Sequence, residues 1–213
     1  PYAGSQPLYT GETDAATNKF WPAMGPMDFP EISGAGYRAY FTLPNNERYY
    51  TKVIGRVQIF VLNSGSSLWQ DNAEPDGITS LSQQAAWLQG AIAGSMALWK
   101  IVVIAQGPYS SGTVAYPGLG SSTWNFPGMR ADIVISGNAK NYERLLVNSF
   151  PYIVNGAGGM TLESFNATPL ATSVARYFAA HGALRVTAGC NRLTFEFVNV
   201  SGTVIDTYTI TKQ

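Results

Sequence analysis

The chain has 213 residues, enough to bury a substantial hydrophobic core as a single domain. Lysine plus arginine and aspartate plus glutamate number 13 each, so no net charge steers the chain toward nucleic acid or an anionic membrane. Charged residues make up 12%, about half of the usual share, which favours an extracellular or virion surface over the cytosol. The one cysteine excludes an internal disulfide, and no apolar run is long enough for membrane insertion.

The N-terminal part of the chain, residues 1–36, is dense in proline and glycine and predicts irregular structure. A domain rarely begins with so long an irregular segment. We therefore expect the fold to start upstream of Pro1 and residues 1–213 to form one N-terminally truncated domain. Weak alternation predicts a strand over 37–43, and stronger alternation before the apolar run IFVL predicts a strand over 49–62.

One helix is expected in the middle of the chain. Thr79 or Ser80 can cap its start, and Gly94 can end it. Several apolar or small side chains recur at helical spacing and should face the core: Leu81, Ala85, Leu88 and Ile92.

Two short runs rich in β-branched residues, 101–104 and 133–135, predict buried strands of an α/β sheet. Ligands of open α/β sheets gather beyond the carboxyl ends of the strands. The segments that follow these runs, AQGPYSSG (105–112) and SGNAKNYER (136–144), should therefore border any catalytic site. Both segments lack the histidines and carboxylate pairs that such a site would use.

The C-terminal part of the chain alternates differently. Residues 151–155 predict a short strand, and residues 173–181 predict one or two helical turns or a surface loop. Three alternating runs joined by hairpin signals then predict an antiparallel meander: 183–188, 193–198 and 204–210.

Several ordered motifs resemble those of the calcineurin-like metallophosphoesterases, in their purple acid phosphatase branch. PAMGPMD is similar to the Gly-Asn-His-Asp turn of that family, and IVVIAQGPYSSG is similar to its His-His-Pro-Pro-Tyr-Ser-Ser-Gly segment. SGNAKNYER resembles Gly-His-x-His-x-Tyr-Glu-Arg, with Gly137, Tyr142, Glu143 and Arg144 in register. The resemblance implies a four-layer α/β/β/α sandwich that lacks its first strands.

The metal ligands that the resemblance implies are largely replaced. Pro26 stands for the Asn ligand, and Met27 stands for the His that acts as an acid, next to the retained Asp28. Ala105, with Gln106 beside it, replaces one His ligand, and Asn138 and Lys140 replace the two His of the last motif. Only Tyr2 matches a ligand of the family, whose Asp ligands would lie before Pro1.

The resemblance therefore implies an inactive relative with no catalytic residues, no metal and no other cofactor. If the fold holds, Asp28, Asn138 and Lys140 should cluster. We favour the interpretation that they are the remains of an abandoned site, and the alternative is a remodelled polar pocket for a sugar or another neutral ligand. Four aromatic side chains in the loops around that pocket are candidates for binding: Trp69, Tyr109, Tyr116 and Trp124.

Two classes of function remain open. The first is a structural or adhesion module of an extracellular or virion assembly, such as a phage tail fibre that binds a receptor. Its expected partners are copies of itself, taken as a trimer because fibres are often trimeric, and a surface glycan or a neighbouring virion protein. The second is a secreted hydrolase with a remodelled, metal-independent site, although with one His and one Cys we identify no Ser/His/Asp or Cys/His set, and no paired carboxylates stand out.

Overall fold

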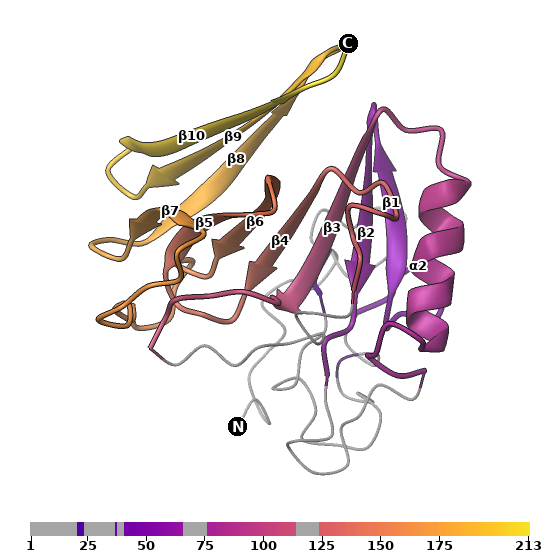
Figure 1. Ribbon diagram of the computed structural model, residues 1–213, viewed down its shortest axis with the longest axis horizontal. Coiled ribbons are helices and arrows are strands. Elements are labelled where there is room, and N and C mark those ends of the chain that lie inside the picture. Colours follow the sequence, from indigo (N-terminus) through magenta and orange to yellow (C-terminus); the bar gives the residue numbers. More distant parts are fainter. Residues whose placement is uncertain (1–20, 24–36, 38–40, 66–75, 114–123) are drawn as a thin grey trace.

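The computed structural model describes residues 21–23, 37, 41–65, 76–113 and 124–213. They form a seven-stranded sheet, a three-stranded sheet and the helix α2 (Gln83–Ala93), arranged in layers (Figure 1). The larger sheet has the order β1-β2-β3-β4-β6-β5-β7. Its strands are β1 (Tyr50–Ile54), β2 (Val57–Leu62), β3 (Trp99–Gln106), β4 (Ile133–Gly137), β5 (Tyr142–Val147), β6 (Phe150–Asn155) and β7 (Ser173–Tyr177).

The centre of this sheet is parallel. β2 pairs with β3, β3 with β4, and β4 with β6, all in parallel register, whereas β1, β5 and β7 join in antiparallel register. The β-branched runs 101–104 and 133–135 lie in β3 and β4, which confirms both predicted strands. Each of these strands pairs on both sides, β3 with β2 and β4, and β4 with β3 and β6.

The segment 49–62 is a hairpin and not one strand. β1 and β2 pair with Ile54 opposite Val57, and Gly55 between them has a φ of 57°. Glycine adopts this left-handed conformation without the clash that a Cβ would cause, so the chain reverses here. The weak strand predicted over 37–43 is not found at residues 41–43, and residues 38–40 lie outside the described part.

Helix α2 starts later than the sequence predicts. The hydroxyl of Ser82, and not of Thr79 or Ser80, accepts a hydrogen bond from the backbone N–H of Ala85 at 3.2 Å. Leu81 therefore precedes the helix and is 96% exposed, so its assignment to the core is wrong. Ala85, Leu88 and Ile92 are buried as predicted, and Gly94 is the C-cap.

The C-terminal meander is confirmed. β8 (Gly182–Ala188), β9 (Arg192–Asn199) and β10 (Val204–Thr211) form an antiparallel sheet of order β10-β9-β8. Residues 173–177 are the strand β7, so the predicted helical turns or loop are wrong there. These residues form a strand because they pair with β5. Five residues show too little alternation of apolar and polar side chains for the strand to be predicted from sequence.

Two apolar clusters separate the layers. One cluster packs α2 against the larger sheet, through side chains such as Leu88, Phe60 and Val102. The other lies between the two sheets and includes Trp99, Phe195 and Phe197. The described residues thus supply three of the four expected layers, α/β/β. No helix among them is long and apolar enough to cross a membrane.

Candidate functional site

The parallel strands all end at one edge of the larger sheet (Figure 1). Beyond their carboxyl ends lie Asn63 and Ser64 after β2, Gln106 in β3, and Asn138 after β4. Several polar residues at this edge of the sheet are buried, including Asn63, Ser64, Gln106 and Ser136. Polar groups taken out of water must find partners, so their contacts define what this edge does.

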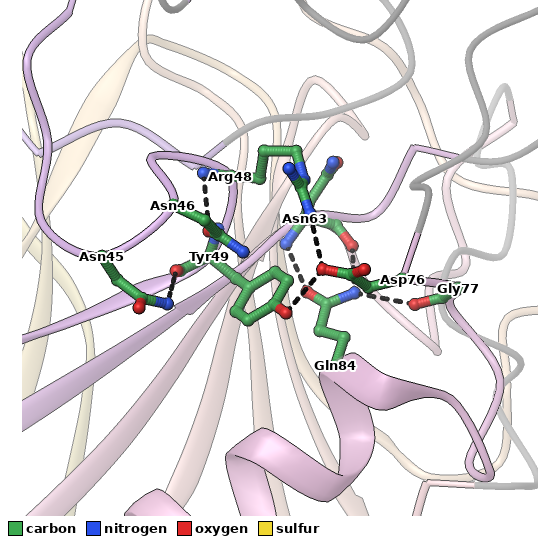
Figure 2. Close-up of polar contacts among 8 residues, drawn as sticks. All are labelled: Asn45, Asn46, Arg48, Tyr49, Asn63, Asp76, Gly77 and Gln84. Carbon is green, nitrogen blue, oxygen red and sulfur yellow. Dashed lines mark hydrogen bonds and ion pairs between the residues drawn. The ribbon is translucent and has the colours of Figure 1, made fainter.

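The side-chain amide of Gln84 in helix α2 is hydrogen-bonded to the backbone of Asn63 at the end of β2 (Figure 2). The backbone N–H of Asn63 donates to Oε1 of Gln84 at 2.8 Å, and Nε2 of Gln84 donates to the carbonyl of Asn63 at 3.1 Å. The same Nε2 donates to the carbonyl of Gly77 at 3.1 Å. Both side chains are fully buried. Because these groups satisfy one another, this part of the edge serves packing.

Asp76 is engaged in the same network (Figure 2). Nη2 of Arg48 and the hydroxyl of Tyr49, the latter at 2.7 Å, both donate to Oδ2 of Asp76. Burial and the hydrogen bond to Asp76 raise the pKa of Tyr49 to about 12. Tyr49 is therefore a neutral phenol at ordinary pH, and the cluster joins the loop before β1 to the start of α2.

The positions at which the resemblance implies histidines lie at the same edge. Ala105 is half-buried in β3 and Gln106 is buried, with its backbone N–H donating to Oγ of Ser64 at 2.9 Å. Asn138 is exposed and has a φ of 64°. Nζ of Lys140 lies 4.0 Å from Oε2 of the buried Glu163. Tyr2, Pro26, Met27 and Asp28 lie outside the described residues, so their expected place beside these residues stays a prediction.

A small cavity remains at this edge. Its volume is about 10 Å³, roughly the room that one water molecule needs. It is lined by Gly107, Tyr109, Ser110, Ser136, Gly137, Asn138, Ala139 and Val154. A cavity of this volume is too small to enclose a sugar or a phosphate ester.

The candidate binding aromatics are not a stacking surface where the structure describes them. Trp124 is 4% exposed, and its indole N–H donates to the carbonyl of Ile78 at 2.7 Å, so its assignment as an exposed binding residue is wrong. Tyr109 is half-buried and packs edge-on against Tyr152, with ring centroids 4.8 Å apart. Trp69 and Tyr116 lie outside the described residues.

The Tyr-Glu-Arg part of the last motif holds the fold together. Oε2 of Glu143, which is fully buried, accepts from the backbone N–H of Ser111 at 2.7 Å, and Oε1 accepts from the hydroxyl of Ser173. Arg144 and Tyr142 both donate to Asp206 in β10. Glu163 and Asp206 were missed by sequence reasoning because each lies far along the chain from the motif that it contacts.

Comparisons with known proteins agree with this geometry. A family model described as iron/zinc purple acid phosphatase-like protein C matches residues 149–207. A purple acid phosphatase, PPD1 from yellow lupin (Lupinus luteus) seeds, superposes with a TM-score of 0.69 at 18% identity, over 84% of this chain and 35% of that one. GAP50, the anchor in the inner membrane complex of Plasmodium, gives 0.60 at 19% identity, over 82% of this chain and 57% of that one.

A search of curated proteins found no match. The chain thus has the purple acid phosphatase-like fold of the metallophosphoesterases, and it spans about a third to somewhat over half of the two structures above.

A dinuclear metal centre is what this fold implies, and the residues at the edge do not fit one. Within the described ranges, no three or more His, Cys, Asp or Glu side chains gather closely enough to hold a metal ion. The methyl group of Ala105 offers no donor, and an ammonium group such as that of Lys140 repels a divalent cation.

Proposed function

We propose that this domain is a catalytically inactive form of the purple acid phosphatase-like fold and works by binding, as a structural or adhesion module of an extracellular or virion assembly. The observation that carries the proposal is the contact between Lys140 and Glu163, with Nζ 4.0 Å from Oε2. A fixed positive charge on the chain occupies the place in the motif where a metal ligand is expected.

The chemistry of the fold supports this reading. Phosphate ester hydrolysis by two metals needs ligands that hold both ions and a bound water that becomes the nucleophile. The methyl group of Ala105 and the ammonium group of Lys140 supply no metal ligand. Asn138 is exposed at the edge. Among the described residues, the cavity beside them has room for about one water molecule.

Composition and a structural relative support a role in assembly. With 13 positive and 13 negative side chains, identical copies meet little long-range repulsion. GAP50 is an anchor in a membrane complex of Plasmodium, so anchoring is one use of this fold, and we extend that kind of role to this chain. The extracellular or virion setting rests on the low share of charged residues.

The experiment is a phosphomonoesterase assay on the purified chain. The chain is incubated with Fe³⁺, Zn²⁺ or Mn²⁺ and given p-nitrophenyl phosphate over acid to neutral pH, with an active purple acid phosphatase as the positive control. We expect turnover no higher than that of buffer with the same metals. Turnover that scales with the concentration of the chain, and that disappears with a chelator, contradicts the proposal.

A further inference from the structure

The outer edge of β10 differs from every other sheet edge that the structure describes. Four strands lie at sheet edges: β1 and β7 in the larger sheet, β8 and β10 in the smaller one. Edge strands commonly carry charged side chains that block pairing with another chain. β1 carries Lys52, β7 carries the exposed Arg176, and β8 carries Arg185.

β10 carries no outward-facing charged side chain, and its one irregularity, a bulge between Val204 and Asp206, lies before the stretch 207–211. Its eight residues include one charged side chain, Asp206, which accepts hydrogen bonds from Arg144 and Tyr142 and faces the larger sheet. Its other face carries three exposed threonines, Thr207, Thr209 and Thr211, and before the bulge the exposed Val204. In the described part of the chain, β10 pairs only with β9. Figure 1 shows it as an outermost strand, away from the helix.

We propose that β10 is a self-association edge, at which two copies of this chain pair antiparallel and join their small sheets across a twofold axis. A register centred on Thr209 places Thr207 of one copy opposite Thr211 of the other. Threonine pairs across strands are favourable, and no two like charges face each other in this register. The result is a closed, isologous dimer and not the trimer expected from sequence.

The proposal deepens the assembly role proposed above by naming a partner and a surface. It does not depend on the metal chemistry of the carboxyl edge, so either proposal can fail alone. A chain that is strictly monomeric removes the dimer and leaves the phosphatase assay unaffected. Phosphatase activity removes the inactive reading and leaves β10 untouched.

The test is sedimentation velocity of the full chain over a wide range of concentrations. Thr209→Lys places two ammonium groups together at the twofold axis, and we expect at least about tenfold weaker dimerisation. Thr187→Lys is the matched control. Thr187 and Thr209 both lie opposite Thr194 of β9, and both are exposed, but Thr187 belongs to the other edge strand. Thermal unfolding of each variant verifies that the fold is intact.

A charge swap completes the test. Thr209→Lys mixed with Thr209→Glu should restore the dimer, since opposite charges then meet at the axis. The proposal is overturned if the unmodified chain stays monomeric at the highest concentration. It is equally overturned if the two lysine variants weaken association to the same extent, or if the charge-swapped mixture does not associate.

Discussion

The guanidinium of Arg144 holds the carboxylate of Asp206 by two hydrogen bonds, from Nε to Oδ2 at 2.7 Å and from Nη2 to Oδ1 at 3.0 Å. Arg144 lies in β5 of the larger sheet, and Asp206 lies in β10 of the smaller one. Tyr142 donates to the same carboxylate at 2.7 Å and stacks on Phe197, with ring centroids 4.2 Å apart. The Tyr-Glu-Arg motif thus fastens the two sheets together.

Breaking this pair should destabilise the domain strongly. The side chains of Arg144 and Asp206 are 11% and 13% exposed, so Arg144→Ala leaves a largely buried carboxylate without its cation. We expect a loss of about 3 kcal/mol in the free energy of unfolding, measured by urea denaturation. Arg185→Ala removes the solvent-exposed pair with Glu196 and serves as the control, with little or no expected change in the free energy of unfolding. Equal losses for the two variants would contradict this role of Arg144.

The same pair should give the domain an acid-sensitive stability. Burial alone would raise the pKa of Asp206, but hydrogen bonds from Arg144 and Tyr142 outweigh burial and hold that pKa below its ordinary value. A carboxyl group with a lowered folded-state pKa stabilises the fold above its unfolded-state pKa, about 3.9, and this contribution is lost as the pH falls further. Unfolding midpoints measured from neutral pH to below 3.9 should therefore fall more steeply in the unmodified chain than in Asp206→Asn. Parallel curves would refute the assignment.

Gly156 should tolerate no side chain. A Cβ at this position would lie 1.7 Å from the carbonyl oxygen of Ala139, in the loop that carries Asn138 and Lys140. Because the obstacle is backbone, Gly156→Ala must displace the loop, and we expect a loss of about 3 kcal/mol or more in thermal or urea unfolding. Gly158→Ala is the control, since nothing lies within 4 Å of its Cβ position. A stable Gly156→Ala variant would show that the loop is less constrained.

Trp124 should act through the core and not through a ligand. Trp124→Phe removes the indole N–H that donates to Ile78, and we expect a loss of about 1 kcal/mol. Trp124→Ala also removes the ring that stacks on Phe126, with an expected loss of about 3–5 kcal/mol. Calorimetric unfolding measures both. Unchanged stability in Trp124→Ala would point back to an exposed binding residue.

The sequence predicts the strongest elements of this fold correctly for local reasons. The runs 101–104 and 133–135 are dense in β-branched residues, and the C-terminal runs alternate with hairpin signals between them. These patterns can be recognised without knowing which strand each one pairs with. The motif ending in Arg144 also falls at the predicted edge, because the carboxyl ends of parallel strands meet there.

The elements that sequence misses depend on distant contacts. β7 is a strand because β5 pairs with it. Leu81 is exposed because Ser82, the residue after it, caps the helix, so Leu81 lies outside the helix. The sequence around Trp124 is rich in glycine and serine, as in many binding loops, but the ring of Trp124 packs in the hydrophobic core. The contact of Lys140 with Glu163 spans 23 positions (163 − 140) without any periodic signal.

The metal content of the purified chain decides whether this domain is an inactive form of the fold. Elemental analysis follows incubation with Fe³⁺ and Zn²⁺ and removal of the unbound ions. Because Ala105 and Lys140 stand at positions where the resemblance implies metal ligands, we predict no stoichiometric iron or zinc. About two metal ions per chain, the content of a working two-metal site, would contradict the account.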